Sequence, residues 1–318
     1  MSRPERAARP RRLLMCPPTY FSVDYAINPW MVPGRPVDRS LAVRQWEHLV
    51  DVYRSLGHRV EFAAPVPGLP DMVFSANAAT VVDGRVLVAR FRHPERAPEA
   101  LAFWRWFTGR PFTEVGMAAH VNEGQGDILA AGRTLLAGTG FRTEPAAHDE
   151  VRRRLGRPVV TLRLADPHFY HLDTALCVLS DTEAAYYPGA FDRAGLARLE
   201  ALFPDALLAT REEAARFELN AFSDGRHVVL PNTADRLADR LSERGFEPVG
   251  VDVSEFRKAG GGAKCCTLEL DSAPSDWSRP EAPGADARPA DIHAADAHAV
   301  DAQHLGASRT RAARPDAA

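Results

Sequence analysis

The sequence predicts an α/β fold in which a unit of strand, hairpin, strand, helix and strand repeats around a central axis, as a five-bladed α/β propeller. Short strand pairs joined by tight turns recur along the chain, and a helical pattern follows each pair. The period lies in the forties, which is typical of a closed or stacked array and not of a doubly wound sheet. Five units fit between residues 8 and 270, so the first strand of each is expected to begin near the axis.

The turns mark the paired strands. Three of them contain glycine, which readily adopts the positive φ angles of two-residue hairpins, and a fourth is weaker. The hairpin segments are residues 83–88, 131–136, 224–229 and, for the weaker copy, 181–187. The helical patterns are residues 95–107, 145–155, 193–203 and 234–244, with another at 41–56 after a first strand at 13–16.

The two ends differ from the propeller domain, residues 13–270. Residues 1–12 carry five arginines and no apolar run, so we expect a flexible basic leader and neither a signal peptide nor a membrane anchor. Residues 271–318 hold four large apolar residues in 48, too few to offset the entropy of ordering, so we predict a disordered tail. Its histidines have no partner ligands at fixed spacing, and we expect no metal site.

Composition narrows the class of protein. The net charge of −3 gives no basic surface for nucleic acid, and the 45% of hydrophobic residues suffices for a substantial core. No apolar run approaches the about 18 residues that span a bilayer, so we expect no membrane association. The four cysteines, Cys16, Cys177, Cys265 and Cys266, form no C-x-x-C pair, which indicates a reducing, cytoplasmic location. Cys16 and Cys177 lie in apolar strands and are expected in the core.

Residues 258–270 carry the first chemical signal. Three glycines at 260–262 allow a tight turn, and Cys265 follows at the start of a strand-like Thr-Leu-Glu-Leu segment. A thiol in this place can be approached closely, and a nearby cation, such as Lys264, would favour the nucleophilic thiolate. For a lone cysteine, a buried structural role is the stronger interpretation. The rest of the repeat reverses that preference.

Polar residues recur at similar places in successive units. They are Asn28, Asn77, Glu123, His171, Asn220 and Cys265, with separations of 45 to 49 residues. A radial repeat would bring them to one point. Cys265 is then the candidate nucleophile, and His171 can protonate a leaving group and later deprotonate water. Glu123 and Asp173 would oppose thiolate formation unless the substrate is a cation, and a guanidinium suits them because its N–H groups match carboxylates.

Five motifs in this order resemble those of the guanidino-group-modifying enzymes, the pentein superfamily of arginine deiminases, dimethylargininases, amidinotransferases and arginine dihydrolases. The motifs are Phe-x-x-Asn at 74–77, Glu-Gly-x-Gly-Asp at 123–127, Phe-Arg-Thr at 141–143, His-Leu-Asp at 171–173 and Gly-Gly-Gly-x-x-Cys at 260–265. Each is weak alone, and together they are specific. The resemblance implies a five-bladed propeller, no cofactor, a small guanidino substrate and a covalent intermediate on Cys265 in preference to Cys266.

The resemblance also assigns roles by position. His171 and Glu123 match the catalytic histidine and its partner acid. Asp173 matches a guanidinium-binding carboxylate of deiminases and amidinotransferases, where dimethylargininases usually have a different residue. Arg96 and Arg142 match arginines that hold the α-carboxylate of the substrate; without the resemblance they would be read as surface residues.

Asn77 departs from part of this pattern. Deiminases and dimethylargininases carry aspartate there, whereas arginine dihydrolases resemble this chain at Asn77 and at Asn28, although Asp71 matches a site acid of dimethylargininases. The resemblance therefore implies a hydrolase of L-arginine or a methylated arginine, with arginine dihydrolase ahead of dimethylargininase. Alternatives are an amidinotransferase, which needs an acceptor amine in place of water, and a non-catalytic arginine sensor.

Four further residues have plainer interpretations. Asp127 either braces a turn or touches substrate, and the two readings are equally favoured. Asn220 is expected to be structural. Trp104 and Trp106 are expected to pack in the core or at an interface, so a homo-oligomer stays open.

Overall fold

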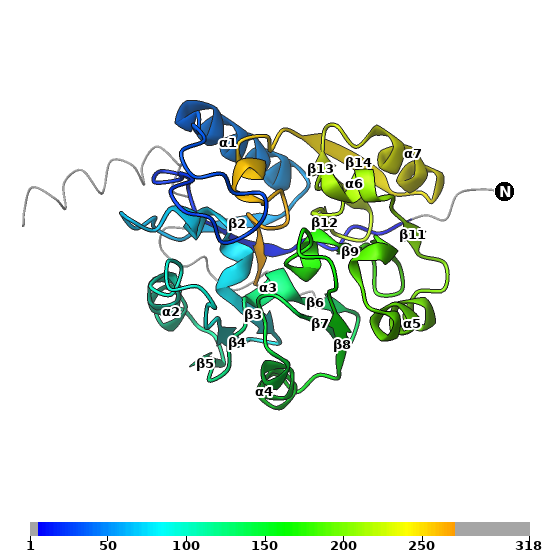
Figure 1. Cartoon of the computed structure of the whole chain (residues 1–318), viewed down its shortest axis with the longest axis horizontal. Coiled ribbons are helices and arrows are strands. Elements are labelled where there is room, and N and C mark those ends of the chain that lie inside the picture. Colours follow the sequence, from blue (N-terminus) through cyan, green and yellow to red (C-terminus); the bar gives the residue numbers. More distant parts are fainter. Residues whose placement is uncertain (1–5, 271–318) are drawn as a thin grey trace, which may run out of the picture.

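The computed structural model describes residues 6–270 of the 318-residue chain. They form five three-stranded sheets arranged around a common axis, and the longer helices lie outside the ring of strands (Figure 1). These helices are α1 (Arg39–Ser55), α2 (Glu99–Thr108), α4 (Pro145–Leu155), α5 (Arg193–Leu202) and α7 (Asp235–Glu243). The predicted repeat of five strand-and-helix modules is confirmed.

One topology is common to the sheets. In the second module, β3 (Ala79–Val82) and β4 (Arg85–Val88) form an antiparallel hairpin, and β5 (Glu114–Met117) returns after α2 to pair with β4 in parallel. The predicted hairpin turn is present, with positive φ angles at Asp83 and Gly84. The corresponding strands of the other modules are β6 (Ile128–Ala131), β7 (Thr134–Thr139), β8 (Val159–Arg163), β9 (Leu176–Val178), β10 (Ala184–Tyr186), β11 (Leu207–Leu208), β12 (Phe222–Ser223), β13 (His227–Pro231) and β14 (Glu247–Val251).

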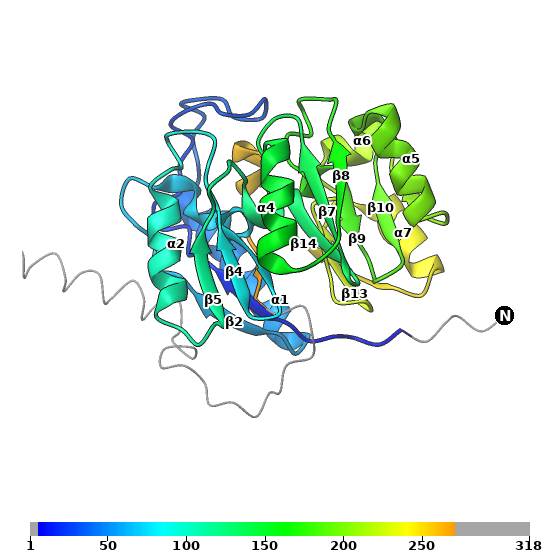
Figure 2. The same ribbon diagram turned by 90° about the horizontal axis from the view of Figure 1, so that it is seen from below.

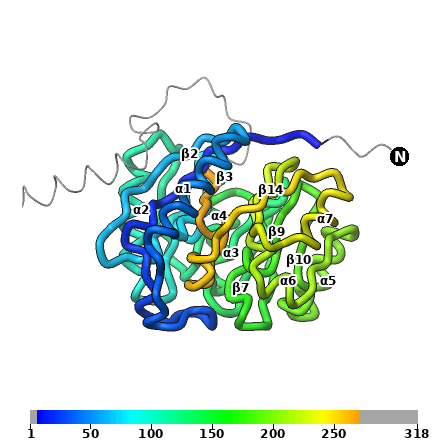
Figure 3. The backbone as a smooth tube through the Cα atoms, turned by 90° about the horizontal axis from the view of Figure 1, so that it is seen from above, coloured from blue at the N-terminus to red at the C-terminus, as the bar shows by residue number. Residues whose placement is uncertain are grey.

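The remaining sheet is closed by the two ends of the described chain. β15 (Leu268–Glu269) pairs antiparallel with β1 (Arg12–Met15), which pairs in parallel with β2 (Arg59–Phe62). Figure 3 shows the orange C-terminal segment beside the blue N-terminal strand. The strand that follows Cys265 is thus hydrogen-bonded to the first strand, which fixes the thiol relative to the whole ring.

Helix boundaries agree with the predicted ones except at α2, which begins at Glu99 and not at residue 95. Pro98 explains the shift, because a residue that precedes proline is disfavoured in the α conformation and a helix cannot run through it. The two short helices are α3 (Gly124–Asp127) and α6 (Arg211–Ala215). Figure 2 shows α2 and α4 on the outer face of the strands. No described helix is long and apolar enough to cross a membrane.

The basic leader makes defined contacts from Arg6 onward, where the sequence predicts a flexible segment. Arg6 forms two 2.7 Å bonds to the carboxylate of Glu183 and lies 3.4 Å from the ring centre of Phe246. The backbone N–H of Arg9 donates to the carbonyl of Asp224 at 2.9 Å. Residues 1–5 and 271–318, with the predicted disordered tail and its histidines, lie outside the described residues.

Candidate active site

Five polar side chains occupy equivalent places, just before the first strand of each of the five sheets. They are Asn77, Glu123, His171, Asn220 and Cys265. Asn77 lies in the short turn η2 (Ser75–Ala78), and Glu123 and His171 directly precede α3 and η3 (Leu172–Thr174). The five first strands begin near the axis, so the side chains converge as the repeat predicted.

Each of the three glycines in the turn before Cys265 is required for a different reason. Gly260 has a φ angle of +82°, which residues with a side chain rarely adopt. A Cβ on Gly261 would lie 2.2 Å from the Phe74 ring, and one on Gly262 would lie 2.8 Å from Asn220 Oδ1. The turn therefore brings the backbone against both neighbours and delivers Cys265 to the axis.

The thiol of Cys265 is buried between two polar partners. Its Sγ accepts a bond from Asn220 Nδ2 at 3.0 Å and donates to Asp173 Oδ2 at 3.3 Å. Burial raises the pKa of Cys265 well above its ordinary value, and the charge of Asp173 adds to the rise. Lys264 does not act as the expected cation, because its ammonium donates to Gln125 Oε1 at 3.0 Å and pairs with Glu269 at 3.3 Å. Burial and the neighbouring carboxylate therefore favour the protonated thiol.

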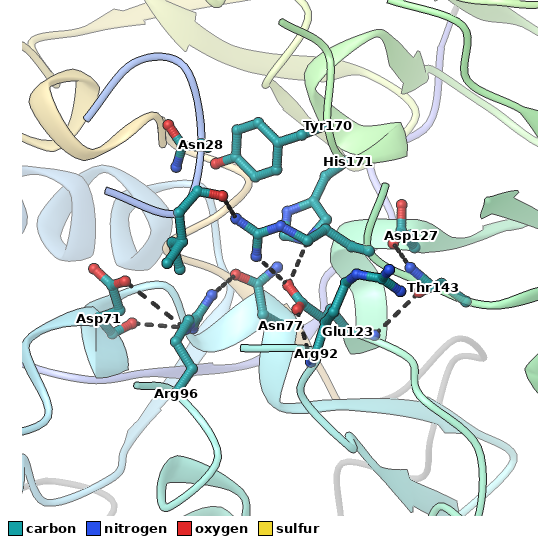
Figure 4. A network of polar contacts seen from close by, with 12 residues as sticks. Asn28, Asp71, Asn77, Arg92, Arg96, Glu123, Asp127, Thr143, Tyr170 and His171 are labelled. Atoms are coloured by element: carbon teal, nitrogen blue, oxygen red, sulfur yellow. Dashed lines mark hydrogen bonds and ion pairs between the residues drawn. The ribbon is translucent and has the colours of Figure 1, made fainter. Parts of the chain in front are cut away.

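Glu123 fixes the imidazole of His171. Its Oε2 lies 2.7 Å from His171 Nε2 and accepts from Arg142 Nη1 at 2.7 Å, and its Oε1 accepts from the backbone N–H of Arg92 (Figure 4). Burial opposes ionisation of Glu123, but Arg142 and the bond with His171 outweigh it and hold the pKa well below the usual range. An ionised carboxylate on one ring nitrogen leaves the other, Nδ1, available for proton exchange with a ligand.

Four buried polar atoms of the site have no hydrogen-bond partner. They are Asp71 Oδ1, Asn77 Nδ2, His171 Nδ1 and Asp173 Oδ1. Burial raises the pKa of Asp173 to about 7, although Lys264 and the bond from Cys265 oppose the rise. Unpaired buried polar atoms cost free energy, and so many together indicate a place for a polar ligand.

Asn77 is held by Arg96, which has a different set of partners from those expected. Arg96 is 3% exposed and donates to Asn77 Oδ1 at 2.7 Å and to the carbonyl of Asp71 (Figure 4). It also donates to both carboxylate oxygens of Glu99. Four of its five N–H groups are thus used within the protein. The oxygen of Asn77 therefore faces Arg96.

The polar side of this site also includes Tyr25, which donates to Asp71 Oδ2 at 2.8 Å. Burial raises the pKa of Asp71, with Arg96 and Tyr25 opposing the rise. Asp71 therefore keeps one oxygen for a ligand.

Comparison with known proteins identifies the family. The protein-family model described as "N,N dimethylarginine dimethylhydrolase, eukaryotic" matches residues 35–272 of this chain. The chain belongs to the N,N-dimethylarginine dimethylhydrolase family. It is therefore a hydrolase of carbon–nitrogen bonds in linear amidines, as the motifs predicted.

Relatives of this dimethylarginine dimethylhydrolase family member include a dimethylargininase and a bifunctional arginine dihydrolase. It is 53% identical to the N(G),N(G)-dimethylarginine dimethylaminohydrolase of Mycobacterium tuberculosis, over 83% of this chain and 87% of the relative. It is 39% identical to the bifunctional arginine dihydrolase/ornithine cyclodeaminase AgrE of Nostoc sp., over 81% of this chain and 38% of that enzyme. The chain thus spans about two fifths of the bifunctional enzyme.

Solved structures agree with the fold. The substrate-bound N-terminal domain of ArgZ, described as an arginine dihydrolase from cyanobacteria, is 37% identical, with a TM-score of 0.79 over 82% of this chain and 98% of that one. A dimethylarginine dimethylaminohydrolase adduct, 19% identical, has a TM-score of 0.68 over 82% of this chain and all of that one. The five-bladed pentein propeller is confirmed.

Two residues of this family member differ from their expected places. Asn28 does not belong with the five converging side chains, because each of the five sheets has only one position just before its first strand. It lies instead in the loop between β1 and α1. Its Nδ2 donates to the carbonyl of Ala259 at 3.0 Å and its Oδ1 accepts from Trp30 N–H, so it holds the glycine turn. Asn220, expected to be structural, contacts Cys265 directly, and its position in the spacing series was the signal for it.

Asp127 and the other cysteines have structural roles. The two oxygens of Asp127 accept the backbone N–H groups of Leu172 and Thr143, so it braces the segment that carries His171. Cys16 and Cys177 are buried in the core, as expected. Among residues 6–270, no cluster of His, Cys, Asp and Glu could hold a metal ion.

Proposed function

We propose that this chain is an arginine dihydrolase, which takes free L-arginine to ornithine, carbon dioxide and two molecules of ammonia. The observation that supports it is the orientation of Asn77, whose oxygen faces Arg96 and whose unpartnered nitrogen is left for a ligand. A guanidinium offers only donors, whereas the ureido group of citrulline also has an oxygen that can accept this N–H. The site thus suits both the first substrate and the intermediate product.

In the first round, the guanidinium brings a further positive charge to Asp173 and Asp71, whose pKa values burial raises. With this charge in place, the thiol of Cys265 loses its proton to His171 and its sulfur attacks the guanidino carbon. His171 gives that proton to the departing ammonia, which leaves a cationic thiouronium on Cys265. Water, deprotonated by His171, then attacks the carbon, and the sulfur leaves with a proton to give citrulline.

The second round uses the same groups on citrulline. Attack by Cys265 expels the second ammonia and leaves a thiocarbamate, whose carbonyl oxygen accepts from Asn77 Nδ2. Water cleaves the carbon–sulfur bond and gives a carbamic acid, which loses carbon dioxide to yield ornithine. Glu123 keeps His171 oriented in both rounds.

We propose that Arg142, and not Arg96, holds the α-carboxylate of the substrate. It uses two of its N–H groups, on Glu123 Oε2 and the carbonyl of Ile27, and lies 4.7 Å from the ring centre of Tyr170. Arg96 has only one N–H without a protein partner. We therefore propose that Arg96 serves the site by holding Asn77.

Dimethylargininase is the second candidate, favoured by the family model and the 53% identical relative. Against it, asymmetric dimethylation removes two N–H donors from the guanidinium. A buried carboxylate oxygen of Asp71 or Asp173 left without a donor would cost about 1–3 kcal/mol. An amidinotransferase would require an acceptor amine in the place of water.

The buried free cysteines support a cytoplasmic location.

The test is the product mixture from L-arginine alone, followed for ornithine, citrulline and ammonia together. Ornithine with two ammonia per arginine supports the dihydrolase, and citrulline with one indicates a deiminase. No turnover until a methylarginine is added would overturn the proposal in favour of dimethylargininase. No turnover until an acceptor amine is added would indicate a transferase.

A further inference from the structure

Glu99 is a buried acid that none of the site assignments includes. It is the first residue of α2 and is fully buried. Its two oxygens accept from Arg96 Nε at 2.9 Å and Arg96 Nη2 at 2.8 Å, as a bidentate pair. Such a pair fixes both the position and the plane of the guanidinium.

The fixed guanidinium determines which way the amide of Asn77 faces. Arg96 Nη1 donates to Asn77 Oδ1 at 2.7 Å, and because arginine only donates, the amide oxygen must be on this side. The nitrogen is then directed away, to the buried space beside Gly126. A Cβ on Gly126 would lie 2.2 Å from Asn77 Nδ2 and 3.1 Å from His171 Nδ1, so both nitrogens border the same place.

We propose that Glu99 is a positioning residue, which through Arg96 holds Asn77 with its N–H donor directed at the reacting group. The consequence rests on the proposed function: a donor in this place stabilises an oxygen on the reacting carbon, as in citrulline and the thiocarbamate. Without the pair, Arg96 can turn and the amide of Asn77 can rotate to present its oxygen, which repels a ureido oxygen.

Stability alone does not account for this pair. Burial raises the pKa of Glu99 to about 7, with Arg96 opposing the rise, so placing an acid here costs desolvation free energy that the ion pair only partly offsets. Buried ion pairs are often no better for stability than apolar residues of similar volume. Orientation of Asn77 is what the pair adds here.

The test is Glu99→Gln, which keeps the shape but places an NH2 group against Arg96. We expect the ratio of citrulline to ornithine from L-arginine to rise about tenfold, which corresponds to about 1.4 kcal/mol. The matched control is Glu61→Gln, since Glu61 is also buried and pairs with two arginines, Arg12 at 3.0 Å and Arg110 at 3.4 Å. It should lower the melting temperature without changing the ratio. An unchanged ratio in Glu99→Gln would overturn the proposal.

A double-mutant cycle with Asn77→Ala keeps the test independent of the product. If Glu99 acts through Asn77, the double variant is no slower than Asn77→Ala alone; additive losses of kcat would contradict the proposal. If the wild type makes no ornithine, the dihydrolase assignment fails, and the same cycle on whichever substrate is turned over still decides the role of Glu99. If Glu99→Gln does not fold, Glu99→Asp takes its place in the same double-mutant cycle. Aspartate keeps the charge and shortens the side chain by one methylene.

Discussion

Asn220 and Cys265 are joined by a reciprocal pair of hydrogen bonds. The Nδ2 of Asn220 donates to Sγ of Cys265 at 3.0 Å, and the backbone N–H of Cys265 donates to Oδ1 of Asn220 at 3.1 Å. One amide therefore both fixes the backbone of the nucleophile candidate and contacts its sulfur. A donor at this distance stabilises the thiolate more than the thiol, because hydrogen bonds to charged groups are the stronger ones.

The first prediction concerns this amide. Asn220→Ala should slow alkylation of Cys265 by iodoacetamide and lower kcat, each by about tenfold or more, since a bond to a charged group contributes about 1.5–3 kcal/mol. The rates are read by mass spectrometry of the Cys265 peptide and by ammonia release. Asn232→Ala, at an exposed asparagine, is the control. An alkylation rate equal to that of the control would show that the amide does not stabilise the thiolate.

The second prediction concerns Asn77. Asn77→Asp should pair well with Arg96 but offer the site an acceptor in place of a donor. The guanidinium of arginine tolerates this change and the ureido oxygen of citrulline does not, so ornithine should fall at least several-fold relative to citrulline, at about 1.4 kcal/mol per tenfold change. Both products are measured in one time course. If the wild type makes ornithine and the variant keeps the same ratio, Asn77 does not determine the outcome.

The third prediction concerns pH and Asp173. Burial raises its pKa to about 7, above the ordinary value of an unfolded aspartate, so its contribution to stability is full below about pH 4 and is lost as the pH rises through 7. Asp173→Asn has no such loss. The melting temperature of the variant should therefore rise relative to wild type between pH 4 and pH 8, whereas Asp205→Asn, at an exposed aspartate, should run parallel to wild type. A constant offset for Asp173→Asn would contradict the assignment.

The architecture and the set of converging residues were predictable because both follow from the regular spacing of the repeated modules along the sequence. A helix and a polar residue recur once per module, three of the modules also have a turn glycine, and a radial repeat places equivalent positions at one axis. The same series included Asn28 by spacing alone, although its place in the first loop breaks the equivalence. Spacing also indicated Asn220, whose chemistry gave no reason to select it.

The pairing of the charges was not predictable from spacing. The sequence places Lys264 next to Cys265, but adjacent residues point different ways, and its ammonium is taken up by Gln125 and Glu269. Glu99 lies three residues after Arg96, which is a common helical spacing, and nothing in the pattern connects it with Asn77. Such partners depend on side-chain directions that only the packed structure fixes.

We propose that Cys265, and not Cys266, forms the covalent bond to the guanidino carbon. Both thiols are buried and burial raises both pKa values, but among the described residues only the thiol of Cys265 is hydrogen-bonded to Asp173 and Asn220. The decisive measurement is peptide mapping by mass spectrometry of protein quenched during turnover of L-arginine, in wild type, Cys265→Ser and Cys266→Ser. We predict a substrate-derived adduct on Cys265, retained in Cys266→Ser with most of the activity. In Cys265→Ser we predict neither adduct nor activity. An adduct on Cys266, or turnover by Cys265→Ser, would show that Cys265 is not the nucleophile.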